Sequence, residues 1–146
     1  MTIIAVVNDQ IYTDSFCVTD GLVGSTNKVR DSIFGKYATA GCPNTAAQFI
    51  QHLEREGNLY LPVQNKDPDH TCIVLRAADS IKCVYMGRTG EIMSDVLRPD
   101  NSGLQYVAGS ARAFFLAYFA EHGSVQHALE LTAKHHSDVA APFSVF

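Results

Sequence analysis

The feature that most constrains the fold is a pair of short apolar runs at the start of the chain. They cover Thr2–Val7 and Gln10–Phe16, and a polar tip at Asn8-Asp9 separates them. Two apolar runs around a short polar tip form the pattern of an antiparallel β-hairpin. Asp14 ends the second run, and Lys28 follows after a glycine-bearing connection.

Thr2, Asp14 and Lys28 together indicate one kind of chemistry. An N-terminal threonine carries both a nucleophile and a base, because its free α-amine can take the proton of its own hydroxyl. A nearby lysine ammonium would lower the pKa of that amine, and an aspartate would hold the lysine charged and oriented. We therefore expect the Lys28 Nζ atom within salt-bridge reach of the Asp14 carboxylate.

The rest of the chain continues as one unit, with strands first, then a helix, a hairpin, two helices and a last strand. Such an order predicts an α+β sandwich. Asn44 and Ser124 are expected helix N-caps. The predicted strands are Thr71–Arg76, Ile81–Met86, Leu104–Ala108 and Phe143–Phe146, with a strand pair inside Ile33–Ala40; the predicted helices run from Asn44 to Glu56, from Gly109-Ser110 to Glu121, and over Val125–His136.

This succession resembles the proteasome β-subunit group, which includes the heat-shock peptidase HslV and short proteasome-like proteins of phages. The group opens Thr-Thr-Ile and continues to Asp-Ser-Arg and Lys-Val. The counterparts here are Thr2-Ile3-Ile4-Ala5, Asp14-Ser15-Phe16 and Lys28-Val29-Arg30. The resemblance covers nearly the whole chain and implies one domain, a four-layer αββα sandwich in which two antiparallel sheets are flanked by helices.

Three downstream positions match the same group. The resemblance implies that Gly41, in Ala40-Gly41, offers its backbone N–H to the oxyanion, where a side chain would block the scissile carbonyl. It also implies that Ser110 and Asp138 form a hydrogen-bonding network near the threonine amine. From the residues alone, Gly41 can equally be a turn glycine and Ser110 can equally be a helix cap. For Asp138, the alternative is a solvent-exposed aspartate in a loop.

The chain departs from the group at several positions. Phe16 stands where the group has arginine, Ile3 where threonine is usual, and Ala111 where a second glycine follows the serine. A second register would align Met1 with the nucleophile. We favour Thr2, because its spacing to Asp14 then matches the short phage-type pattern.

The composition and charge of the chain indicate which kinds of partner and compartment to expect. The chain has 146 residues and a net charge of −4 with no basic run, which argues against nucleic acid. It shows no apolar run of membrane-helix length and no signal peptide. Its four cysteines are far apart and lack a Cys-x-x-Cys pair. Reduced thiols in the cytoplasm are therefore favoured over a disulfide framework.

Neither a cofactor nor a metal is expected, although histidines crowd the C-terminal helices. His122 and His127 lack the four-residue spacing of a helical metal pair. The segment Ala111–Phe119 carries more aromatic surface than one core face needs, which predicts a homo-oligomer. The resemblance implies a ring, and it leaves any ATPase unfoldase partner unknown.

Two hypotheses for the function follow. The first is a threonine peptidase or amidase acting on a peptide or protein substrate, with Thr2 exposed by removal of Met1. The second is a catalytically inactive structural or assembly protein of the same fold, which the Phe16 departure and the short chain favour.

Overall fold

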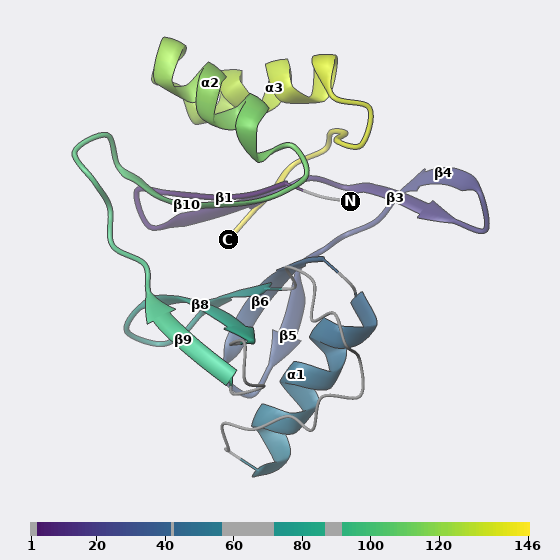
Figure 1. The fold of residues 1–146 in the computed structure, drawn as a ribbon, viewed down its shortest axis with the longest axis vertical. Helices are drawn as coiled ribbons and strands as arrows, with labels where there is room; N and C mark the ends of the chain where they lie inside the picture. Colours follow the sequence, from purple (N-terminus) through teal and green to yellow (C-terminus); the bar gives the residue numbers. More distant parts are fainter. Residues whose placement is uncertain (1–2, 42, 57–71, 87–91) are drawn as a thin grey trace. The chain divides into compact units, whose positions relative to one another are not determined.

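The protein is described by a computed structural model that covers residues 3–41, 43–56, 72–86 and 92–146. The chain divides into two compact units (Figure 1). The first unit combines Met1–Val29 with Arg98–Phe146, and the second is Arg30–Leu97. Each unit has its own antiparallel sheet, its own hydrophobic core and its own helical cover.

The main sheet of the first unit has the strand order β10-β1-β2-β11, and every neighbouring pair in it is antiparallel. Its strands are β1 (Ile3–Val7), β2 (Gln10–Thr13), β10 (Leu104–Gly109) and β11 (Ser144–Val145). Segments from the start, the middle and the end of the chain therefore meet in this one sheet.

The β1–β2 hairpin turns at the predicted Asn8-Asp9 tip. Both residues have positive φ, 49° and 60°, as a two-residue type I′ turn requires. Gly103, just before β10, and Gln105, within β10, hold the tip in place: the Asn8 N–H donates to the Gly103 carbonyl at 2.8 Å, and the Gln105 side chain exchanges hydrogen bonds with the N–H and the carboxylate of Asp9. The predicted hairpin is thus confirmed.

Two helices, α2 (Arg112–His122) and α3 (Val125–His135), cover one face of this sheet (Figure 1). Alternate residues of β1 contact them, because successive side chains of a strand point to opposite faces. The Ser124 hydroxyl accepts a hydrogen bond from the His127 N–H, which confirms the predicted N-cap of α3. The core consists of Ile3, Ala5, Val7, Val107, Ala111, Phe115, Phe119, Ala128, Leu129 and Val139.

The second unit is a five-stranded antiparallel sheet in the order β5-β6-β7-β8-β9, with α1 (Pro43–Glu56) against it (Figure 1). Apolar residues at helical spacing, among them Phe49 and Ile50, pack on Tyr37, Ile73 and Leu75 of the sheet. The strands are β5 (Arg30–Ser32), β6 (Gly35–Ala40), β7 (Cys72–Arg76), β8 (Ile81–Met86) and β9 (Ile92–Val96).

A third sheet contains only β3 (Phe16–Thr19) and β4 (Leu22–Ser25), which pair with each other. The predicted strand Gln10–Phe16 is therefore wrong at its end, since β2 stops at Thr13 and a new strand starts at Phe16.

The predicted four-layer αββα sandwich is wrong. The described residues form three antiparallel sheets and three helices, with more strand than helix, grouped in two units. One physical reason is the break at Asp14-Ser15. There the backbone of Ser15 bonds to Ala140 and Thr26 instead of continuing a ladder, so the chain starts a separate two-stranded sheet.

Smaller differences concern the ends of elements. Helix α1 begins at Pro43, where proline suits the first helical position, so Asn44 lies inside the helix and not at its cap. Strand β9 was not predicted. The sequence also predicts that Gly57 ends α1, that residues 58–70 form a loop and that residues 88–90 form a turn, but these positions lie outside the described residues. Among the helices that are described, none has the length and apolarity to cross a membrane.

Candidate active site

Asp14 is a buried carboxylate at the break between β2 and β3. The residue is 1% exposed, and its two carboxylate oxygens are occupied by donors from three segments. The Oδ1 atom accepts from the Ile3 N–H at 3.1 Å and from the Lys28 Nζ at 2.9 Å. The Oδ2 atom accepts from the Phe16 N–H at 3.1 Å. A buried charge is tolerated when it is paired and hydrogen-bonded in this way.

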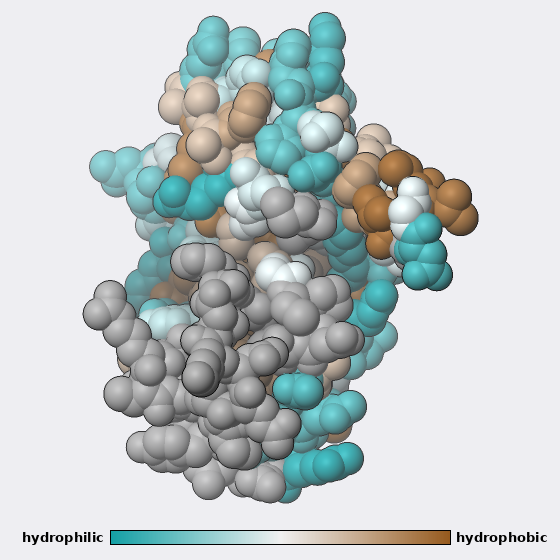
Figure 2. Space-filling model, turned by 45° about the vertical axis from the view of Figure 1, so that its right-hand side comes forward, coloured by the Kyte–Doolittle hydropathy of each residue, from teal (hydrophilic) through white to brown (hydrophobic). Residues whose placement is uncertain are grey.

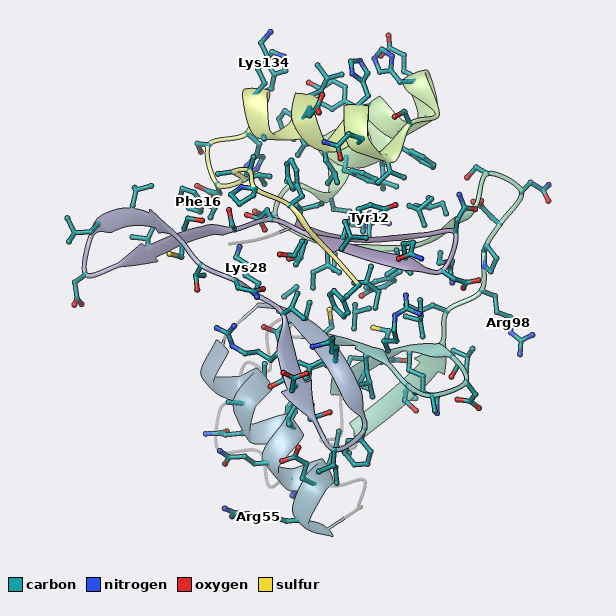
Figure 3. All side chains as sticks on the ribbon, turned by 180° about the vertical axis from the view of Figure 1, so that it is seen from behind. Tyr12, Phe16, Lys28, Arg55, Arg98 and Lys134 are labelled. Carbon is teal, nitrogen blue, oxygen red and sulfur yellow. The ribbon has the colours of Figure 1, made fainter. Side chains whose placement is uncertain are left out.

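Lys28 forms the predicted ion pair. Its side chain is 14% exposed and that of Asp14 is 0% exposed. Figure 3 shows the Lys28 side chain in the segment that follows β4. An ion pair with so little exposed surface is weakly screened by salt. By contrast, the pair between Lys36 and Asp31 in the second unit is open to solvent, with side chains 55% and 81% exposed.

The pair lies beside the start of β1. Ile3, whose N–H binds Asp14, is the first described residue of that strand. Thr2, the predicted nucleophile, lies outside the described residues, and one peptide bond joins it to Ile3. The described part of the site therefore converges on the residue that directly follows Thr2.

Ser110 lies at the same end of the β1–β10 ladder. Its neighbour Gly109 is opposite Ile3 in the register, and Ser110 itself is exposed. It does not cap α2, since the N-cap is Ala111 and no side chain bonds there. Ser110 is therefore placed beside the strand pair that carries Ile3.

Asp138 lies in the turn after α3 and is half-buried. Its Oδ1 atom accepts from the Ser137 hydroxyl at 3.3 Å, and its N–H donates to His136 Nδ1 at 3.2 Å. Within the described chain, no hydrogen bond joins the side chains of Ser110 and Asp138. The segment after Asp138 reaches the site through Ala140, whose carbonyl accepts from Ser15.

Gly41 belongs to the second unit, after the end of β6. Its φ of +96° is a conformation that favours glycine, as the turn interpretation expects. Its part as an oxyanion donor stays a prediction.

Two contributors were missed by reasoning from the sequence. Phe16, read as the loss of an arginine, donates its backbone N–H to Asp14. Ser15 ties the same loop to the C-terminal segment. A backbone N–H is supplied by every residue except proline, so no side-chain pattern could have identified Phe16. Across the described residues, no group of three or more His, Cys, Asp or Glu side chains could hold a metal.

No protein-family model matches the chain, and no curated protein matches it. The chain is, however, similar to solved structures. A Thiobacillus denitrificans protein, BPH, in complex with epoxomicin is 12% identical with a TM-score of 0.62, and the match covers 100% of this chain and 97% of that one. A second structure of BPH gives 12% identity, a TM-score of 0.61, and coverage of 100% and 96%. At this identity, the similarity is one of fold.

Proposed function

We propose that this chain is a proteasome-like threonine peptidase or amidase of the N-terminal-nucleophile type. The observation that carries the proposal is the buried Lys28–Asp14 pair, bonded to the backbone N–H of Ile3 next to Thr2. A lysine beside an N-terminal amine lowers the pKa of that amine and so favours its neutral, basic form.

In the proposed reaction, removal of Met1 frees the α-amine of Thr2. That amine takes the proton of the Thr2 hydroxyl while the hydroxyl oxygen attacks the substrate carbonyl carbon. The C–N bond of the tetrahedral intermediate then breaks, and the departing amine takes the proton. Water hydrolyses the resulting ester and regenerates Thr2. In this reaction Lys28 favours the neutral base, and Asp14 orients Lys28.

The fold similarity to BPH supports this proposal indirectly. BPH was solved with epoxomicin, so we infer that the present chain, once Thr2 is exposed, also binds that compound. Ser110, beside the residue opposite Ile3, and Asp138 support the Thr2 amine in this proposal, as the resemblance implies.

An inactive assembly protein is the second candidate. The β3–β4 hairpin favours it, because its apolar side chains Val18, Leu22 and Val23 are 57%, 76% and 73% exposed. Figure 2 shows apolar surface concentrated where this hairpin projects. Phe114 of α2 is also exposed, at 40%. Apolar surface of this kind marks contact sites, so we propose that the chain forms a homo-oligomer, to be tested by light scattering at micromolar concentration.

Peptide hydrolysis separates the two candidates. Protein cleaved from a fusion to expose Thr2 is assayed beside Met1-bearing protein on a broad peptide library. We expect the exposed form to cleave peptide amides and the Met1-bearing form to be inert, because Met1 converts the Thr2 amine into a non-basic amide nitrogen. Equal inertness of the two forms would favour the assembly protein.

A further inference from the structure

Ser15 joins the three segments that build the site. Its N–H donates to the Ala140 carbonyl at 3.1 Å, and its own carbonyl accepts from the Thr26 N–H at 2.8 Å. Asp14 precedes it in the chain, and Lys28 follows two residues after Thr26. One residue therefore links the aspartate loop, the lysine segment and the C-terminal segment.

The hydroxyl of Ser15 adds a further bond to this junction. Ser15 is 4% exposed, and its Oγ donates to the same Ala140 carbonyl at 3.2 Å. A carbonyl oxygen has two lone pairs, so it can accept both the N–H and the hydroxyl. The N–H alone would satisfy the carbonyl, and the hydroxyl therefore adds a restraint on where residue 15 lies.

This restraint acts on Asp14 through the adjacent backbone. The Asp14 Oδ2 atom depends on the Phe16 N–H, and its Oδ1 atom depends on Ile3 and Lys28. A shift of residue 15 relative to Ala140 would move the Phe16 donor and so rotate the carboxylate. Functional groups are held accurately when the groups behind them are themselves bonded.

We propose that Ser15 is a positioning residue, whose hydroxyl fixes the Asp14–Lys28 pair against Ile3 by anchoring the loop to Ala140. The effect of Ser15 on catalysis rests on the proposed peptidase function, whereas its effect on the position of the Asp14–Lys28 pair does not. The same anchor links Asp138, two residues before Ala140, to the site.

The geometric effect is tested by amide hydrogen exchange. The measured quantity is the exchange rate of the Ile3 N–H relative to that of Val6, in the middle of β1. In Ser15→Ala we expect this ratio to rise roughly 3- to 10-fold, the effect of losing about one hydrogen bond. Ser15→Thr, which keeps the hydroxyl, should restore the ratio. Ser144→Ala, in β11 of the same C-terminal segment, should leave it unchanged.

A parallel rise at Ile3 and Val6 would overturn the proposal, because it would mean that Ser15 only stabilises the strand. An unchanged ratio would also overturn it. If Ser15→Ala does not fold, Ser15→Cys, which has a similar size and a weaker donor, is measured in the same way.

The catalytic meaning is tested with exposed-Thr2 protein. We expect Ser15→Ala to lower kcat about 3- to 10-fold at unchanged KM and Ser15→Thr to recover it. A rise in KM alone would contradict a positioning role. If wild-type protein is inert, the peptidase proposal fails, and the exchange ratio still decides whether Ser15 positions the pair.

Discussion

The backbone N–H of Ile3 donates to the carboxylate of Asp14, through the same Oδ1 atom that binds Lys28. This bond connects the first described strand to the ion pair directly, without an intervening side chain. Any movement of the Asp14 carboxylate therefore changes its hydrogen bond to Ile3, the residue next to Thr2.

Replacing Asp14 tests the buried pair. Asp14→Asn keeps the size of the side chain but leaves Lys28, only 14% exposed, without its anion. Breaking a buried pair on one side costs about 3–5 kcal/mol in the free energy of unfolding, measured by urea denaturation. The matched control is Asp31→Asn, which breaks an exposed pair and should cost about 1 kcal/mol or less. Equal losses in the two variants would contradict the buried role of Asp14.

Two glycines with positive φ differ in their surroundings. A Cβ on Gly35, at φ +134°, would collide with the backbone carbonyl of Arg76, whereas a Cβ on Gly123, at φ +66°, meets nothing within 4 Å. Gly123→Ala should cost about 1–2 kcal/mol in unfolding free energy from backbone strain alone. Gly35→Ala should cost at least about 2 kcal/mol more, since the backbone must also shift. Thermal unfolding of both variants measures the two losses in unfolding free energy. A larger loss for Gly123→Ala than for Gly35→Ala would contradict the close packing around Gly35.

The pH dependence of stability is expected to include Asp100. Hydrogen bonds from the Ser102 hydroxyl and from the backbone N–H groups of Ser102 and Leu104 hold the pKa of Asp100 below its ordinary value of 3.8. A folded-state pKa below the unfolded value means that the stabilisation is fully present above pH 3.8 and is lost as the pH falls through the folded pKa.

Asp100→Asn should therefore be less stable than wild type at pH 7, and the difference should shrink in strong acid. Urea unfolding of wild type and Asp100→Asn, at pH 7 and in strong acid, measures this difference in stability. A difference that grows on acidification would contradict the expected sign.

Local patterns predicted much of the fold. The hairpin around Asn8-Asp9, the strand Ile81–Met86 and the cap at Ser124 follow from residues close in sequence, and these were confirmed. The end of β2 could not be predicted in this way, because it depends on Ser15 bonding to Ala140, 125 residues away. Hydrogen bonds between residues so far apart in the chain produce no periodic pattern in the sequence.

The candidate site shows the same division. Asp14 and Lys28 could be paired from residue type and spacing, and the ion pair is present. The backbone donors from Ile3 and Phe16 could not be identified, since a hydrogen bond from an N–H reveals nothing about the side chain. The layer arrangement failed for a different reason: it came from family resemblance, and the described sheets and helices divide between two units.

In the proposed reaction, Thr2 is the nucleophile. The direct measurement compares exposed-Thr2 protein with its Thr2→Ala and Thr2→Ser counterparts, all cleaved from the same fusion, for hydrolysis of peptide amides. We expect Thr2→Ala to be inert and Thr2→Ser, which keeps a hydroxyl beside the α-amine, to retain activity. A positioned base contributes on the order of 10²–10⁴-fold, so even weak turnover should be measurable. Equal activity of the exposed-Thr2 and Thr2→Ala proteins, or equal inertness across a broad library, would contradict this role of Thr2.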